Sequence, residues 1–333
     1  MASSISNHTI ASVVEPLMDE QNNRMTVYPI KYYDIWSAYK NQQASFWTAE
    51  EIDFSEDYIH FQKLNENEQF FIKMVLAFFA ASDTIVNINI GERFINDIQI
   101  REAIIAYNYQ MMMENIHSEV YSLMIDNIIK DNKEKEKLFD AIAQYPCIGK
   151  KAQWAQKWIN SDASFAQRLI AFAIVEGVFF SGSFCSIFWI KKRNMMNGLC
   201  SSNELIARDE GQHVDFAALL YSHIQHRVSQ DTVHQMFIDA FEIEREFICE
   251  SLKCSLLGMN SDLMTTYIQF VADRLLVQLG YSKIWNVTNP FDFMESISME
   301  GKTDFFVSRP TQYQKAAVLN TTRDSTYEIT DKF

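Results

Sequence analysis

The sequence predicts an all-α fold, a bundle of long helices with few connections. Gly and Pro are scarce, at 9 and 5 of 333 residues, whereas sheet-rich folds need many tight turns that use them. Apolar residues recur at spacings of three and four over long stretches, which is the helical period. Hydrophobic residues make up 48% of the sequence, with 25 Phe and 15 Met, and these suffice for a large core of bulky side chains.

Charge and cysteine content limit the class of protein. There are 29 basic and 43 acidic residues, a net charge of −14. Such a surface repels phosphate backbones, so we expect no nucleic-acid partner. Five cysteines without a C-x-x-C motif indicate neither a disulfide framework nor a thiolate zinc site. Residues 1–26 lack the apolar core of a secretory signal, and we expect a cytoplasmic protein in a reducing compartment.

Periodicity and composition divide the protein into three parts. Residues 1–24 are polar and predict a mobile N-terminal arm, residues 25–295 the helical domain, and residues 296–333 a flexible, disordered C-terminal tail. The predicted helices span about 65–96, 100–130, 133–151, 165–193, 202–225, 230–257 and 262–281. Turns are expected at Tyr145-Pro146 and Asn197-Gly198.

One helix has the length and composition of a membrane span. Residues 169–190 are nearly all apolar, but Glu176 lies among them. A carboxylate at the bilayer centre costs about 2.5–3.5 kcal/mol on insertion scales. We therefore interpret this segment as a core helix buried on all sides, with a weak point at residues 181–183, and expect no membrane association.

Two copies of a Glu-x-x-His motif stand on predicted helices, at Glu114 and His117 and at Glu210 and His213. Residues three apart project from the same helix face, so each motif offers one carboxylate and one imidazole to the same cation. A single copy arises often by chance on a solvated face. Both copies here have apolar neighbours rather than Lys and Arg, which favours a buried site.

Two further acids, Asp83 and Glu176, lie inside apolar helices. An isolated buried carboxylate is costly, and a lone one is more often neutralised by an Arg or a hydrogen bond. Four acids and two histidines on four helices favour two divalent cations instead, and oxygen and imidazole ligands suit iron or manganese. This is the ligand pattern of ferritin-like di-iron proteins, except that Asp83 stands where a Glu is usual.

Six segments carry a specific resemblance: YPIKYYDIW, ASFWTAEEID, FFAASDTIVN, MENIHSEVYSL, AFAIVEGVFFSGSFCSIFW and SNELIARDEGQHVDFA. From Arg24 to Phe333 the sequence resembles the small, radical-generating subunit of class I ribonucleotide reductase, in its eukaryotic and large-DNA-virus form. The resemblance implies a ferritin-like bundle with extra helices and two iron ions per subunit, with manganese as an alternative. The implied metal ligands are Asp83, Glu114, His117, Glu176, Glu210 and His213.

The same resemblance assigns roles around the metals. Tyr121 is the implied radical-bearing residue, in an apolar pocket of Phe180, Phe184 and Ile206; taken alone, these four would be ordinary core residues. A relay of Trp47, Asp209 and His117 is implied to reach Tyr313 in the tail, and Asp209 would fix the tautomer of His117. The implied side-chain anchors for the partner subunit are Tyr327, Ile329 and Phe333.

The implied reaction is oxygen activation. Dioxygen and an electron donor convert the tyrosine into a radical, which a separate large subunit uses to reduce ribonucleoside diphosphates. The resemblance also implies a homodimer, docked to the large subunit through the tail. Alternatives are another di-iron carboxylate oxidase acting on a small substrate, a ferritin-like storage protein, and a scaffold with paired carboxylates. The first gives no reason for Tyr121, Trp47 and Tyr313 together, and the second is usually far shorter.

Overall fold

The computed structural model describes residues 15–294. These residues contain thirteen α-helices and no β-strand, which confirms the all-α prediction. The helices are α1 Tyr33–Ala44, α2 Asp57–Gln62, α3 Glu66–Asn89, α4 Ile95–Asp97, α5 Arg101–Ile128, α6 Asn132–Phe139, α7 Ala141–Gln144, α8 Pro146–Ile159, α9 Phe165–Ile174, α10 Ser181–Lys191, α11 Asn197–Ser222, α12 Gln230–Arg245 and α13 Ser261–Gln278.

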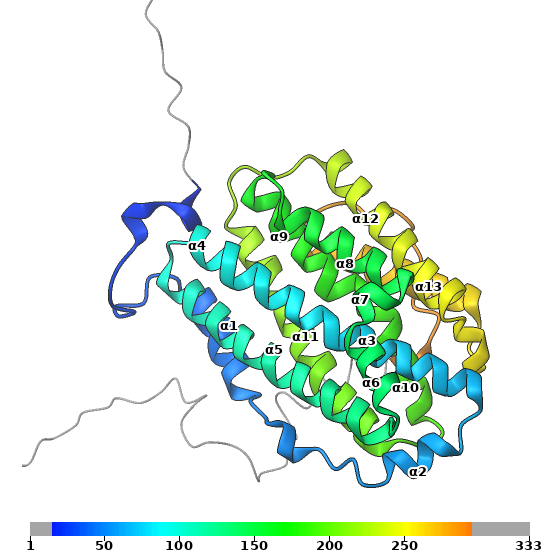
Figure 1. Ribbon diagram of the computed structural model, residues 1–333. Coiled ribbons are helices and arrows are strands. Elements are labelled where there is room, and N and C mark those ends of the chain that lie inside the picture. The colour runs from blue at the N-terminus through cyan, green and yellow to red at the C-terminus, as the bar shows by residue number, and fades with distance from the viewer. Residues whose placement is uncertain (1–14, 295–333) are drawn as a thin grey trace, which may run out of the picture.

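The long helices pack around one core (Figure 1). Helices α3 and α5 lie against each other along much of their length, and α11 packs against α5, α9 and α10. Helix α1 covers α5 and α11 on one side, while α12 and α13 pack together on the other. The helices that carry the two Glu-x-x-His motifs, α5 and α11, therefore face each other inside the bundle.

The predicted apolar helix at 165–193 is interrupted. Helix α9 passes into a π-helical turn, Val175–Phe179, and α10 begins only at Ser181. The weak point therefore precedes the predicted 181–183, and Glu176 lies within the π turn. Such turns inside helices recur at functional sites, because they change which side chains face inward.

Two predicted turns differ from the structure. Asn197 and Gly198 begin α11 rather than form a turn, because the carboxylate of Asp57 accepts the N–H groups of Gly198 and Leu199 at 3.0 and 2.7 Å. The backbone reverses just before, where Met196 is left-handed. At the other site the helix does break, yet Pro146 starts α8, since proline suits the first turn of a helix.

The first described residues are packed against the bundle. Leu17 is fully buried and its carbonyl accepts the N–H of Gln99 at 2.8 Å. Both carboxylate oxygens of Glu15 accept backbone N–H groups, from Gln225 and His226. Residues 15–24 thus belong to the folded domain, not to a mobile arm as predicted. Residues 1–14 and 295–333, with the predicted tail, lie outside the described residues.

Two apolar helical stretches have the length and composition of membrane spans, residues 66–97 and 165–191. In their most apolar windows, 67% and 94% of the residues are buried inside the bundle. The second value confirms the prediction of a helix surrounded by core, with Glu176 in its interior.

Candidate metal centre

All six predicted metal ligands are buried, none with more than 3% of its surface exposed. They come from four places in the sequence that the fold brings together: Asp83 from α3, Glu114 and His117 from α5, Glu176 from the π turn, and Glu210 and His213 from α11. Sequence separation between them is large, so their meeting is a property of the bundle.

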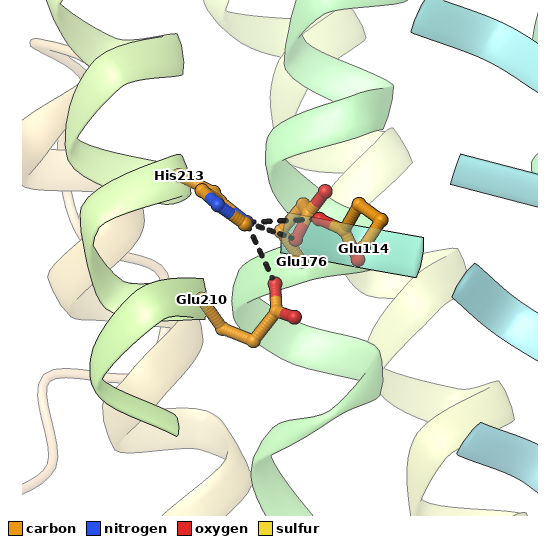
Figure 2. A group of neighbouring side chains, drawn as sticks. All are labelled: Glu114, Glu176, Glu210 and His213. Atoms are coloured by element: carbon orange, nitrogen blue, oxygen red, sulfur yellow. Dashed lines mark hydrogen bonds and ion pairs between the residues drawn. The ribbon is translucent and has the colours of Figure 1, made fainter. Parts of the chain in front are cut away.

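One imidazole lies at the middle of the cluster (Figure 2). The Nδ1 atom of His213 is 2.9 Å from an oxygen of Glu114, 3.2 Å from Glu210 and 3.7 Å from Glu176. One ligand atom from each of these four residues lies within 4.8 Å of the others. His117 also contacts the cluster, with Nδ1 3.1 Å from Glu210 and 3.5 Å from Glu114. Both glutamates therefore reach both histidines.

Asp83 is the sixth candidate and makes no ion pair or hydrogen bond within residues 15–294. Burial, followed by the charge of Glu114, raises the pKa of Asp83 well above its usual value. Asp83 is thus close enough for the charges of the cluster to act on it, and both of its oxygens are without a hydrogen-bond partner among the described residues.

The cluster is electrostatically crowded. Burial and the charges of Glu210 and Glu114 raise the pKa of Glu176 well above its usual value. Burial also acts on Glu210, but its contacts with Glu176 and His213 outweigh it and lower the pKa of Glu210. Burial opposes protonation of both histidines, yet the surrounding carboxylates raise the pKa of His117 and of His213 well above normal. Protons therefore compensate the carboxylates when no metal does.

Unpaired ligand atoms test whether metal ions fit this site. Both oxygens of Asp83 make neither a hydrogen bond nor an ion pair among the described residues. Both oxygens of Glu114, one each of Glu176 and Glu210, and Nδ1 of His117 also make no hydrogen bond there and contact only one another or His213 as ion pairs. Buried polar atoms almost always have hydrogen-bond partners, so a convergent group without them points to a ligand. Carboxylate oxygen and imidazole nitrogen are donors that suit iron or manganese, and two divalent cations would balance four carboxylates. The residues fit a di-metal pair.

Tyr121 lies on α5 beyond His117 and is 2% exposed. Its ring stacks on Phe79 with centroids 4.7 Å apart and an interplanar angle of 13°. Phe180 and Phe184 pack against Phe79 in turn, at 5.6 and 5.0 Å. Ile206 is buried on α11. Burial, then the charge of Asp83, raises the pKa of Tyr121 well above its usual value.

A hydrogen-bonded line leads away from the cluster. The indole Nε1 of Trp47 donates to Oδ2 of Asp209 at 2.7 Å, and Nε2 of His117 lies 3.3 Å from the same oxygen. The rings of Trp47 and His117 are nearly parallel, 6.0 Å apart at 21°. Trp47 is 2% exposed, so this line is sealed from water.

Comparison with known proteins decides the family. Residues 24–290 match the model of the family described as "Ribonucleotide reductase, small chain". The protein belongs to this family.

Small subunits from distant organisms are close relatives. The sequence is 57% identical to the ribonucleoside-diphosphate reductase small chain of Vaccinia virus (strain Western Reserve), over 92% of this protein and 96% of that one. It is also 57% identical to a ribonucleoside-diphosphate reductase small subunit of Arabidopsis thaliana, over 92% of both proteins. The solved structure of the ribonucleotide reductase Rnr4 homodimer from Saccharomyces cerevisiae is similar, with 39% identity and a TM-score of 0.77. The match covers 85% of this protein and 91% of the yeast subunit. The predicted ferritin-like bundle is thus confirmed as the small-subunit fold.

Three residues of this small subunit were not predicted but contact the site. Phe79 stacks on Tyr121. The Gln110 amide donates to Oε1 of Glu176 at 3.2 Å. Arg208 donates to the second oxygen of Asp209 at 2.9 Å.

Helical spacing could have found the first two of these residues. Phe79 precedes Asp83 by four positions and Gln110 precedes Glu114 by four, so each shares the face of a candidate ligand. Of the predicted small-subunit residues, Tyr313, Tyr327, Ile329 and Phe333 lie outside the described residues.

Proposed function

We propose that this small subunit holds two divalent metal ions, iron with manganese as the alternative, and uses them to convert Tyr121 into a radical. The radical starts the reduction of ribonucleoside diphosphates to deoxyribonucleotides in a separate large subunit. The observation that carries the proposal is that a buried tyrosine and a sealed Trp–Asp–His line both adjoin one carboxylate–imidazole cluster. The relatives named ribonucleoside-diphosphate reductase small chain support the same activity.

The metal ligands in this proposal are the six residues of the cluster. Bound there in the reduced state, the metal pair would supply the electrons and the binding site for the reduction of dioxygen. The protein's own contribution is a dry cage, since no ligand is more than 3% exposed, and a hydrogen bond from Gln110 that orients Glu176. Such outer contacts fix the direction of a ligand and tune its basicity.

Tyr121 is suited to hold a radical because its surroundings keep water away. Burial raises the pKa of Tyr121, so the phenol is neutral before it is oxidised, and formation of a neutral radical removes one electron and the Oη proton. Phe79 stacks on the ring of Tyr121, and Phe180 and Phe184 pack behind Phe79. Because the ring is 2% exposed, external reductants lack access to it.

The Trp47–Asp209–His117 line is suited to carry the oxidising equivalent outward. Burial acts to raise the pKa of Asp209, but Arg208, His117 and Trp47 outweigh it and lower that pKa. The ionised Asp209 accepts the Nε2 proton of His117, which leaves Nδ1 of His117 free to face the glutamates and a metal. We propose that the line continues to Tyr313 in the tail.

We further propose a homodimer that docks to the large subunit through Tyr327, Ile329 and Phe333. Four large apolar side chains of α3 and α5 support a dimer, because they are 39–44% exposed: Phe70, Ile88, Met112 and Leu123. Light scattering at micromolar concentration should give twice the 38.8 kDa mass of one subunit. The mass of a single subunit would contradict the dimer.

The five free thiols of the protein support a reducing, cytoplasmic location.

The absorption and electron paramagnetic resonance spectra of the aerobically iron-loaded protein test this function. The proposal requires a sharp tyrosyl band, a radical signal and iron near two per subunit. An oxidase for a small substrate or a storage protein would load iron without the radical. A scaffold with paired carboxylates would load none.

A further inference from the structure

A second buried ion pair lies outside the metal cluster. Lys151 of α8 and Glu244 of α12 are 1% and 0% exposed, and Nζ lies 2.7 Å from Oε2 of Glu244. A buried ion pair seldom improves stability over apolar residues of the same size, because both ions lose their hydration. The contacts of this pair therefore indicate what else it does.

The ammonium group of Lys151 holds one end of the break in the Glu176 helix. Besides its ion pair, Nζ donates to the backbone carbonyl of Phe179 at 2.5 Å. Phe179 is the last residue of the π turn that contains Glu176. A charged side chain bound to a carbonyl inside a helix stabilises an interruption at that point.

The carboxylate of Glu244 holds the other end. Its Oε1 atom accepts the N–H of Gly182 at 3.2 Å, in the first turn of α10. A Cβ atom on Gly182 would lie 2.6 Å from that same oxygen and 2.6 Å from Ile248. Only glycine allows this close approach, so one ion pair fixes the backbone on both sides of Phe180.

The same ammonium group is linked to the ring of Tyr121 through a series of three packed phenylalanines. Nζ lies 3.5 Å from the ring centroid of Phe78, within the range of a cation–π contact. Phe78 packs edge-on against Phe180 at 5.6 Å and 74°, and Phe180 packs edge-on against Phe79, the residue stacked on Tyr121. Lys151 therefore contacts both the backbone after Glu176 and the first of the phenylalanines that lead to Tyr121.

We propose that Lys151 and Glu244 are positioning residues, which hold the interrupted helix in the register that aims Glu176 at the metals and Phe180 at the Tyr121 pocket. The role of Glu176 and Tyr121 in this statement rests on the proposed function. Burial lowers the pKa of Lys151 to about 8 and raises the pKa of Glu244, while the 2.7 Å contact between the two groups opposes both shifts.

The test removes both charges together, in the double variant Lys151→Met, Glu244→Gln. Methionine fills the space beside the phenylalanines, and glutamine keeps an acceptor for the Gly182 amide, so no ion is left unpaired. The matched control is Arg168→Met with Asp97→Asn, which removes a largely buried pair, joined at 2.6 Å, where α9 begins. Both proteins are used at full length, and their thermal midpoints are measured without metal.

Anaerobic calorimetry with Fe(II) then measures the affinity and number of bound metals. We expect the double variant to bind at least one iron about tenfold more weakly, the usual effect of losing a contact that orients a ligand, while the control binds as the unmodified protein does. After aerobic loading, the variant's radical should decay several-fold faster and show an altered resonance line shape.

Unchanged iron affinity in a folded double variant would overturn the positioning role. If that variant does not fold, Gly182→Ala replaces it, because the added Cβ displaces the Glu244 carboxylate; unchanged affinity there overturns the role equally. The iron-binding comparison needs no radical. A protein that binds iron but forms no radical would refute the proposed function, while the affinity difference still decides the role of Lys151 and Glu244.

Discussion

Replacing Tyr121 with phenylalanine removes one oxygen atom and leaves every ring contact in place. The ring is 2% exposed and stacks on Phe79 at 4.7 Å, and phenylalanine fills the same space. If Tyr121 carries the radical, the variant should bind iron normally and give no tyrosyl signal at all. If Tyr121 had only a structural role, the variant would keep the tyrosyl radical signal.

The effect on stability follows from the hydroxyl group. The Tyr121 hydroxyl makes no hydrogen bond among the described residues, and a buried unpaired group of this kind costs about 1–3 kcal/mol. Taking the lower figure, the metal-free variant should be more stable by about 1 kcal/mol, and its melting temperature should rise by about 2 °C. A functional residue whose removal stabilises the protein is expected where activity requires an unfavourable group.

Tyr107 offers a matched control on the same helix. It is fully buried, and its hydroxyl is also unpaired within residues 15–294. Tyr107→Phe should therefore give a similar rise in melting temperature and keep the radical. Iron content, electron paramagnetic resonance and scanning calorimetry on the two variants decide the matter. A normal radical in Tyr121→Phe, or its loss in Tyr107→Phe, would refute the assignment.

Three further outcomes are expected. Glu176→Ala and Glu210→Ala should each reduce bound iron below two per subunit. Glu204→Ala should not, because it removes a half-buried glutamate of α11 that is paired with Lys191. Full iron and radical yield in Glu176→Ala or Glu210→Ala would remove that residue from the ligand set. Fe(II) binding at pH 7 should release protons and weaken as the pH falls, because the two cluster histidines have raised pKa values and must be neutral to bind metal; equal calorimetric heats in buffers of different ionisation enthalpy would contradict this. Deleting residues 327–333 should abolish deoxynucleotide formation and pull-down of the large subunit but spare the radical, and Tyr313→Phe should keep the complex but stop turnover; full turnover by the truncated protein would exclude the docking role.

The sequence sufficed for most of the long helices and for the choice of ligand candidates, but it did not predict α1 or α2 and gave one helix where α6, α7 and α8 follow one another. Glu114 and His117 share a face by spacing alone, and the apolar neighbours of Asp83 and Glu176 indicate buried acids that need a counter-charge. Both are properties of a single helix, so they do not depend on how the helices pack against one another. That the candidates converge on a single point required the packing of α3, α5 and α11 against the π turn.

The errors arose where a distant residue overrides local preference. Asn197 and Gly198 have the composition of a turn, but the Asp57 carboxylate, far away in sequence, binds their end of α11 and makes it helical. The position of the helix break depends on Lys151 and Glu244, which no local pattern around Glu176 reveals. Tertiary contacts of single charged groups thus decide features that periodicity cannot.

The anchoring of α11 at both ends has a mechanical consequence. Asp57 binds the backbone where the helix starts, and Glu15 binds the two N–H groups just beyond its end, through Gln225 and His226. Glu210 and His213 therefore lie on a helix that is tied at both ends, and Glu176 lies in a turn whose far side is held by Lys151 and Glu244. Metal ions that enter or leave should therefore be accommodated by rotation of the ligand side chains rather than by sliding of either helix.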